Sequence, residues 1–523
     1  MLSRCSTAVW FAAILLALSA FGEAAHAQSP CAAPLAVEAQ VAATLTLEGP
    51  EEDTLVQFYA ARAQAGRPDD CAWTDDTIAA LRAVLSHAAN QGLDPARYHA
   101  AAIGGPATPV RDLSATAMAL RYAHDMVMGE VDESRLTADV DVPRPSIDLP
   151  AQLATALGAN QLAPWLTGLQ PADPQYAMLL KALVRYREEA GQGEPPQVPD
   201  GPTMMVGQSD PRIVALKARL RVDGDFAGSD TSPQFDDSTR QAVMSFQRRH
   251  GIAPDGHVGR DTLRALNVSI EQRVQQIAAN LERRRFFGHV VPATRIEVNA
   301  AAATMTLYRN WNAALAMRAV VGDPEHPTPM LVSFKLAAIV LNPPWVIPSS
   351  IIHKEMLPKE ERQPGYLAHN DIHWSGRQLV QSPGPKNALG RIKFEFANPF
   401  SVYLHDTPAH SLFAKYDRAD SHGCVRLEKP GDLALALLND KWPRDRIEQT
   451  IARGATVRIG VRDGPPVVLA YWTVFTDPDG MLEFRDDIYG RDAQLIAAMP
   501  LPSVDEPVAE APGSENCCGI ARD

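Results

Sequence analysis

The spacing of apolar positions changes near residue 294 and divides the chain into a helix-rich part and a strand-rich part. In the first part apolar residues recur three or four positions apart, as Leu81, Leu85 and Ala88 do, which is typical of amphipathic helices. Helices are predicted over 55–65, 77–90, 115–128, 176–190 and 271–286. From Thr294 the period falls to two, which is typical of half-buried strands. Strands are predicted over 295–298, 305–308, 317–321, 336–341, 401–404, 456–459 and 467–475, with one helix over 430–439.

This order of elements predicts a multidomain α+β chain: an all-helical region, a small three-helix module, and a mainly β domain of the sandwich or barrel type. The run of three arginines at 283–285 is expected to be a solvated helix end. The expected boundaries are a helical region 48–190, a Pro- and Gly-rich linker 191–207, the module 208–268, a connecting helix 269–292, the β domain 293–495 and a disordered tail 500–523.

The strand pattern lapses for about forty residues between Asn342 and Pro383, which is too long for an ordinary connection. We expect an inserted lid over 342–383. Its prolines should stiffen it without allowing a strand ladder. Trp345, Tyr366 and Trp374 could pack on a ligand or on one another. A rigid cap without gating is the alternative.

The N-terminus indicates export. Arg4, an apolar run over 8–21 and the A-x-A string Ala25-His26-Ala27 have the layout of a secretory signal peptide over 1–27, with an uncleaved anchor as the alternative. In an oxidising compartment Cys31 and Cys71 could form a disulfide, or remain two thiols. We assign no function to Cys517 and Cys518.

The overall charge narrows the function classes. Hydrophobic residues make up 46% and charged residues 21% of the 523, as in globular proteins. The formal net charge of −13 disfavours a nucleic-acid-binding protein.

The candidate chemistry gathers around Cys424, in the string Ser421-His422-Gly423-Cys424-Val425-Arg426. A thiol needs a base or a cationic neighbour to become a nucleophile. His405 ends a predicted strand nineteen positions earlier. Gly423 permits a sharp turn, expected just before a helix, whose N–H groups could face a developing oxyanion. By residue type, a zinc site formed by His405, His410, His422 and Cys424 is an alternative.

The string of a histidine followed by S-H-G-C-x-R resembles the L,D-transpeptidase catalytic domain, the YkuD-like family. Segments 342–345, 383–390 and 403–408 are similar to its large periplasmic subgroup, which carries a helical scaffold domain, a peptidoglycan-binding module and a capping subdomain. Residues 208–268 resemble that module through Phe246-Gln247, the turns at 250–252 and 255–259, and the T-L-x-x-L string of 262–266. A spacer without a ligand is the alternative.

The resemblance implies roles for nine residues. Cys424 would be the nucleophile, His405 the general base, and the backbone carbonyl of Asp406 the group that orients it. His422 and Gly423 would shape the oxyanion turn. The expected substrate-binding residues are Ser421, which would also hydrogen-bond within the motif, together with Arg426, Trp345 and Tyr366. For Arg426 a structural salt bridge is the alternative.

The implied reaction is acyl transfer in the periplasm. Cys424 would attack the tetrapeptide donor between its L-centre diamino acid and the terminal D-residue. The diamino acid of a second stem would then resolve the thioester into a 3→3 cross-link. Water as acceptor would make the protein an L,D-carboxypeptidase, and a non-catalytic wall-binding scaffold is a third possibility. We expect carbapenems to acylate Cys424, and expect no metal, cofactor or nucleic acid. The protein would contact the membrane only through a transient signal peptide. Its protein partners are unknown.

Overall fold

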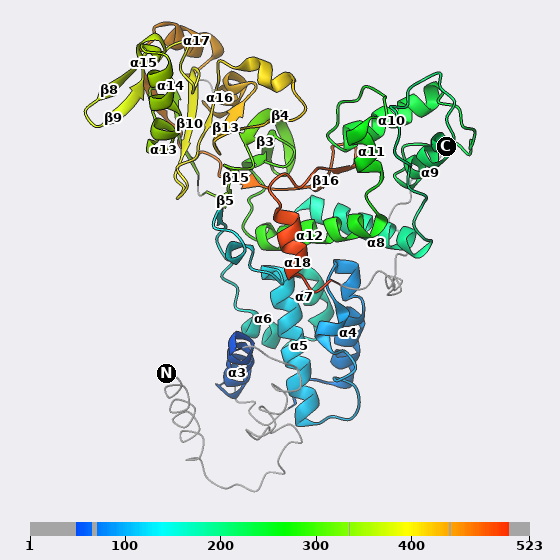
Figure 1. Cartoon of the computed structure of the whole chain (residues 1–523). Helices are drawn as coiled ribbons and strands as arrows, with labels where there is room; N and C mark the ends of the chain where they lie inside the picture. The colour runs from blue at the N-terminus through cyan, green and yellow to red at the C-terminus, as the bar shows by residue number, and fades with distance from the viewer. Residues whose placement is uncertain (1–48, 65–70, 334, 439–440, 502–523) are drawn as a thin grey trace, which may run out of the picture. The chain divides into compact units, whose positions relative to one another are not determined.

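The computed structural model describes residues 49–64, 71–333, 335–438 and 441–501 (Figure 1). The expected signal peptide, Cys31, Cys517, Cys518 and all but the first two residues of the expected tail lie outside these ranges. Cys71 takes part in a disulfide bond. None of the helices in the described ranges combines the length and the apolar composition that crossing a bilayer requires.

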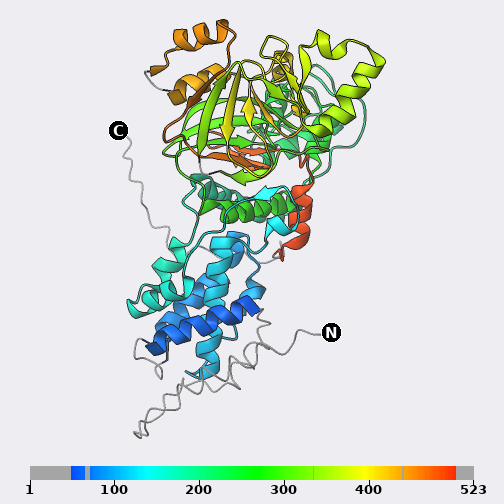
Figure 2. The same cartoon turned by 90° about the vertical axis from the view of Figure 1, so that its left-hand side faces the viewer.

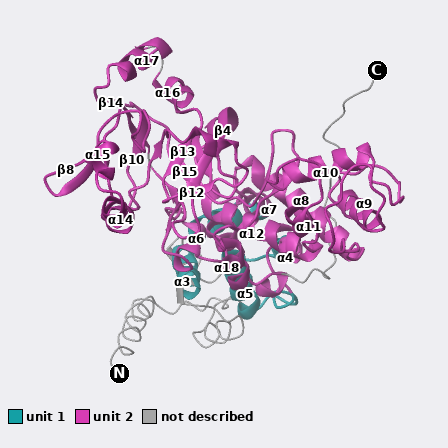
Figure 3. Cartoon of the chain, turned by 45° about the horizontal axis from the view of Figure 1, so that its top comes forward, with its two compact units in different colours: residues 1–81, 101–120, 150–162 teal, residues 82–100, 121–149, 163–523 magenta. Residues whose placement is uncertain are grey.

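The chain divides into two compact units, residues 1–81, 101–120 and 150–162 in one and residues 82–100, 121–149 and 163–523 in the other (Figure 3). The first unit is helical where it is described, and Asp112 organises its interior. The Asp112 carboxylate accepts hydrogen bonds from the Trp73 amide at 3.0 Å and the Tyr59 hydroxyl at 2.7 Å. The helices up to residue 191 are α3 (Gly49–Gln64), α4 (Asp75–Ser86), α5 (Pro109–Met128), α6 (Leu149–Gly158), α7 (Leu162–Gly168) and α8 (Pro174–Gly191), with 3₁₀ turns η1 (Ala88–Gln91), η2 (Pro95–Tyr98) and η3 (Glu133–Arg135).

The small module contains three helices, α9 (Arg212–Val222), α10 (Asp237–Arg249) and α11 (Arg260–Leu266). The Asp236 carboxylate caps α10 by accepting from the Thr239 amide at 2.8 Å. Gln247 links α10 to the turn that follows it, because its amide donates to Asp255 at 2.8 Å and accepts from the Gly256 N–H at 2.9 Å. The glutamine and the turn residues of the module pattern are therefore parts of one hydrogen-bonded unit.

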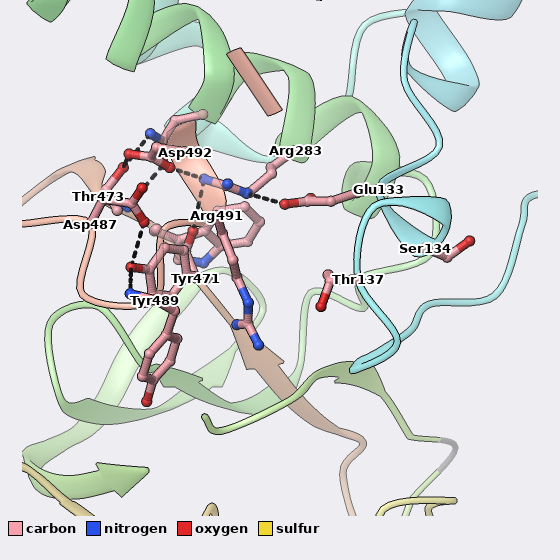
Figure 4. Close-up of polar contacts among 12 residues, drawn as sticks. Glu133, Ser134, Thr137, Arg283, Tyr471, Thr473, Asp487, Tyr489, Arg491 and Asp492 are labelled. Atoms are coloured by element: carbon pink, nitrogen blue, oxygen red, sulfur yellow. Dashed lines mark hydrogen bonds and ion pairs between the residues drawn. The ribbon is translucent and has the colours of Figure 1, made fainter. Parts of the chain in front are cut away.

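The long helix α12 (Ile270–Gly288) runs through the interior of the second unit. Its three arginines are buried, so the expectation of a solvated helix end is wrong. Arg283 donates to Glu133 at 2.9 Å and pairs with Asp492, as Figure 4 shows. Arg284 pairs with Asp173, and Arg285 with Glu282 at 2.8 Å. The periodicity of α12 could not reveal this burial, because three of the four carboxylates come from distant segments.

The strand-rich domain is built on a mixed sheet of twelve strands, in the order β1-β5-β15-β2-β3-β4-β13-β11-β10-β6-β14 with β12 beside β4. This confirms the predicted α+β class. Figure 2 shows α16 (Pro430–Leu438) and α17 (Arg444–Ala452) at one side of the sheet and the helices of the inserted segment at the other. The strands are β1 (Val140–Asp141), β2 (Arg295–Asn299), β3 (Thr304–Arg309), β4 (Asn312–Gly322), β5 (Met330–Val332), β6 (Leu336–Leu341), β10 (Ile392–Phe396), β11 (Leu404–His405), β12 (Ala419–Ser421), β13 (Val425–Leu427), β14 (Val457–Gly460) and β15 (Val467–Ala470).

The remaining elements surround this sheet. The sheet's apolar faces are filled by residues such as Ile339, Phe394 and Leu469. A separate hairpin of β16 and β17 follows the last strand. These elements are η5 (His410–Ala414), α16 (Pro430–Leu438), α17 (Arg444–Ala452), β16 (Val474–Thr476), β17 (Leu482–Phe484) and α18 (Arg491–Ala498).

The inserted segment, which we call the lid, has a sheet and an apolar core of its own. Its strands β7 (Trp345–Val346), β8 (Ile372–Ser375) and β9 (Gln378–Gln381) form an antiparallel sheet, so the expectation that it lacks a strand ladder is wrong. Its prolines lie before residue 365 or at its last position, 383, and so outside β8 and β9, which are joined by a two-residue turn at Gly376 with φ +60°. The helical part of the lid is α13 (Ser349–Ile351), the π-helical turn η4 (Ile352–Met356), α14 (Leu357–Arg362) and α15 (Tyr366–His369).

Candidate active site

Two neighbouring strands bring the candidate nucleophile and base to the same edge of the sheet. Strand β11 runs parallel to β13, with Leu404 opposite Val425 and His405 opposite Arg426. Cys424 directly precedes β13 and therefore lies beside the residue that precedes β11. The expectation that Cys424 lies just before a helix is wrong, since it precedes a strand and α16 begins only at residue 430.

His405 is held in one tautomer. Its side chain is buried, and its Nδ1 lies 2.6 Å from the Asp406 carbonyl oxygen. Because a carbonyl oxygen only accepts, Nδ1 carries the hydrogen and Nε2 keeps its lone pair. Burial, reinforced by the charge of Arg426, lowers the pKa of His405 to about 3. The imidazole is thus neutral at pH 7, the form that a general base requires.

Tyr403 forms hydrogen bonds with the Cys424 thiol and is a site residue that the motif did not single out. Burial raises the pKa of Cys424, while hydrogen bonds from the Tyr403 N–H and hydroxyl act to lower it. The same hydroxyl is hydrogen-bonded to Trp345 of the lid. Tyr403 and His405 are two positions apart, so they lie on one face of the chain, with ring centroids 5.6 Å apart. That two-residue spacing is the signal by which the sequence could have revealed Tyr403.

A hydrogen bond from Thr328 orients the turn before Cys424. Gly423 has φ +94°, a conformation that favours glycine. Its carbonyl accepts a hydrogen bond at 3.0 Å from the hydroxyl of Thr328, which is fully buried and itself accepts from the Gly322 N–H at 2.8 Å. The C=O and N–H of a trans peptide point in opposite directions. Fixing the Gly423 carbonyl therefore directs the Cys424 N–H away from Thr328. No sequence pattern pointed to Thr328.

The Ser421 side chain forms a hydrogen bond within the motif, whereas the Arg426 side chain forms no ion pair among the described residues. The Ser421 hydroxyl is buried and donates to the Cys424 carbonyl at 2.6 Å, within the motif. The partly buried Arg426 lies near Asp420 and Cys424, and burial lowers its pKa. Among the described residues no carboxylate forms an ion pair with Arg426, so the structure gives no salt bridge for the structural alternative. Its guanidinium remains available for an anionic group.

The lid meets the motif through His422. The Nε2 atom of His422 lies 2.7 Å from Oε1 of Glu355, and the side chain is 42% exposed. Glu355 also accepts from Lys359 at 2.8 Å. Partial burial acts to raise the pKa of Glu355, but these two partners hold it below its ordinary value. The centroid of the His422 ring also lies 4.8 Å from the centroid of the His326 ring.

The three aromatic residues predicted for the lid occupy different settings. Trp345 packs on the lid's core and reaches Tyr403. Tyr366 packs on the same core, with Nζ of Lys359 5.9 Å from its ring. Trp374 is 54% exposed on β8.

The described residues contain no group of three or more His, Cys, Asp or Glu side chains that could hold a metal ion. The zinc alternative thus has no ligand set there. Three of its members have other settings: His410 begins η5, His405 donates to the Asp406 carbonyl, and His422 pairs with Glu355.

Three family models match separate parts of the chain. Residues 53–183 match a scaffold domain and residues 209–266 match a "Putative peptidoglycan binding domain". Residues 293–459, which contain β11, β13 and the lid, match the L,D-transpeptidase catalytic domain, YkuD.

A curated protein of Haemophilus influenzae, named "Putative L,D-transpeptidase", is 32% identical over 275 residues. The alignment covers 47% of this chain and 55% of the relative, so the chain spans about half the length of the curated relative that it matches.

Solved structures are matched at lower identity. An L,D-transpeptidase from Mycobacterium smegmatis is 20% identical with a TM-score of 0.20, covering 34% of this chain and 58% of that one. An L,D-transpeptidase from Stackebrandtia nassauensis is 14% identical with a TM-score of 0.21, covering 52% and 96%.

The family match covers the residues whose geometry stands out. Cys424 and His405 both lie within residues 293–459, as do Tyr403, Thr328 and the lid. Residues 293–459 are therefore an L,D-transpeptidase catalytic domain of the YkuD family, carried on a chain that also contains a scaffold domain and a peptidoglycan-binding domain.

Proposed function

We propose that this chain is a periplasmic cysteine L,D-transpeptidase that forms 3→3 cross-links between peptidoglycan stem peptides through a thioester. One observation carries the proposal. A neutral imidazole with a free Nε2 ends the strand beside the one that Cys424 precedes. The export signal predicted over residues 1–27 supports the location.

In the first step the Cys424 sulfur attacks the carbonyl that joins the L-centre diamino acid to the terminal D-residue of the donor. The thiol proton passes to Nε2 of His405 as the carbon–sulfur bond forms. The resulting oxyanion is stabilised by the Cys424 N–H, whose direction is set by Thr328 through Gly423. The intermediate expels the D-amino acid, whose nitrogen takes the proton from His405, and a thioester remains.

In the second step the side-chain amine of another stem attacks the thioester. His405 takes a proton from that amine and returns it to the departing sulfur, which restores the thiol and leaves the 3→3 amide. Water in place of the amine would release a tripeptide, which is the carboxypeptidase reaction. The two reactions share every catalytic group, so the acceptor's access to the thioester decides between them.

The remaining site residues bind substrate or support the motif. Arg426, with no carboxylate partner among the described residues, binds a stem carboxylate. Ser421 contributes by holding the Cys424 carbonyl. The lid covers the thioester and limits the entry of water. Trp345 contacts the site through its hydrogen bond with Tyr403. Tyr366 lines the acyl chain.

Mass analysis of muropeptides tests the proposal directly. The chain without residues 1–27 is incubated with a disaccharide-tetrapeptide. A 3→3 dimer that is absent with Cys424→Ala supports the transpeptidase, whereas tripeptide alone supports the carboxypeptidase. Binding to sacculi with neither product would support the wall-binding scaffold.

Two further measurements test the nucleophile. Incubation with a carbapenem should increase the mass of the protein by that of one carbapenem molecule, bound at Cys424, and should abolish turnover. Activity that survives EDTA would contradict the zinc alternative.

A further inference from the structure

A cleft of about 1140 Å³ lies where the three-helix module meets the strand-rich domain. One wall consists of the end of α10 and the turn leading into α11. The other wall consists of the β2–β3 turn at 300–304 and the segment 414–419 between η5 and β12. The cleft is distinct from the thioester site, since Cys424 and His405 do not line it.

Beside the cleft, the module is held against the β16–β17 hairpin, and Arg485, which directly follows β17, also lines the cleft. The Arg249 side chain donates to the Leu482 carbonyl at 2.8 Å, and Arg485 donates to the Arg249 carbonyl at 2.8 Å. His250 stacks on Phe484 with ring centroids 5.5 Å apart. These contacts join the module to the strand-rich domain at one end of the cleft.

Positive charge collects in the cleft although the protein is acidic. Seven arginine and lysine side chains line it against four carboxylates, while the whole chain has a formal net charge of −13. Three of these cations, Arg248, Arg260 and Arg418, have no carboxylate partner within 4.0 Å among the described residues. A local excess of unpaired cations attracts anionic ligands.

Arg418 is a partly buried cation that forms no ion pair with a carboxylate among the described residues, although Glu428 is near enough to act on its charge. Its guanidinium donates to the backbone carbonyls of Ala319, Ala302 and Ala303, at 3.1 to 3.2 Å, and to those of residues 415 and 416. Burial, with the nearby charges of Arg318 and Arg485, lowers its pKa. An anion in the cleft would supply the missing opposite charge.

The cleft also has an aromatic side chain in its lining, and one of its lining segments continues to Cys424. The Tyr416 side chain lines it and is 51% exposed, which suits packing against a sugar ring. The lining segment continues from Ala419 through β12 into Ser421 and Cys424. A polymer lying in the cleft would therefore contact the module and approach the catalytic turn.

We propose that this cleft binds a peptidoglycan glycan strand whose stem peptides present free carboxylates, and that it delivers the polymer to Cys424. The inference rests on the proposed function for the identity of the polymer. Arg248 and Arg260 contact the carboxylates, and Tyr416 packs on the sugars.

Charge reversal at the two exposed, unpaired arginines tests the proposal in the full chain. Arg248→Glu/Arg260→Glu is compared with Arg453→Glu/Arg462→Glu, which makes the same change of charge at exposed sites outside the cleft. Co-sedimentation with purified sacculi should weaken about tenfold in the first variant, and the difference should shrink at high salt. Arg248→Gln/Arg260→Gln should give a smaller loss in the same direction.

Cross-linking assays separate this proposal from the proposed function. The cleft variant should lose several-fold more activity on sacculi than on a soluble disaccharide-tetrapeptide. Equal loss of sacculus binding in both charge-reversed variants, or no loss in either, would overturn the cleft proposal. A wild-type chain that forms neither dimer nor tripeptide from the soluble substrate would instead overturn the proposed function, and sacculus binding would still test the cleft.

Discussion

Replacing Arg283 by methionine should locally destabilise the centre of the second unit by about 3–5 kcal/mol, the usual effect of removing one partner of a buried ion pair. Arg283 is fully buried, and its guanidinium is the cation that faces both Glu133 and Asp492. Asp492 would keep its hydrogen bond from Thr473 at 2.6 Å. Glu133 would keep fewer hydrogen bonds than Asp492, because its Oε2 atom already lacks a protein hydrogen-bond partner.

The effect should grow with pH. Burial already raises the pKa of both Glu133 and Asp492 above ordinary values, and loss of Arg283 would raise both further. The folded variant would then bind more protons than the unfolded chain above pH 5. Its stability would therefore fall as the pH rises, and the difference from wild type would be larger at pH 8 than at pH 5.

Native-state hydrogen exchange of the α12 amides measures this local stability without assuming that the whole chain unfolds in one step. Arg458→Met is the control, since Arg458 pairs with Glu395 at 3.0 Å while 60% exposed, and such surface pairs contribute at most about 1 kcal/mol. An opening free energy that falls by no more in Arg283→Met than in this control would refute the reasoning.

Four further predictions concern catalysis. Cys424→Ala and His405→Ala should both reduce turnover to background, because the two act as a unit; a nearly active His405→Ala would show that another group is the base. Thr328→Val should lower kcat about tenfold with KM unchanged, and Thr328→Ser should restore it; wild-type kcat in the valine variant would argue against the orienting hydrogen bond. The pH profile of kcat/KM should show no acid limb near 6.5, because the pKa of His405 is lowered to about 3 and its base form persists. Glu355→Gln should raise the ratio of tripeptide to dimer severalfold by loosening the lid from His422, unlike the exposed control Glu361→Gln; equal ratios would exclude a role for this contact.

The sequence could predict those features that repeat or that form an unbroken string. The period of two located β2, β3 and β6 to within a residue or two, and the S-H-G-C-x-R string led to Cys424. Strands of two or three residues, such as β11 and β13, contain too few positions for a period to be recognised. Their pairing is what places Cys424 before a strand rather than a helix.

Contacts between distant segments could not be predicted in this way. Glu355 reaches His422 across 67 positions, and Thr328 reaches Gly423 across 95. The buried arginines of α12 likewise depend on Glu133, Asp173 and Asp492. In each case a polar side chain is satisfied by a partner that only the folded topology brings near.

The neutral state of the Cys424–His405 pair has a consequence for redox chemistry. Thiol–disulfide exchange and peroxide oxidation both require the thiolate. Burial keeps the resting Cys424 protonated, and a neutral His405 supplies no cation to ionise it. The Cys424 thiol should therefore resist oxidants and should not attack the disulfide of Cys71 in the same chain. Under the proposed periplasmic function, this arrangement would keep the cysteine reduced in an oxidising compartment and expose its nucleophilicity only to a bound acyl donor.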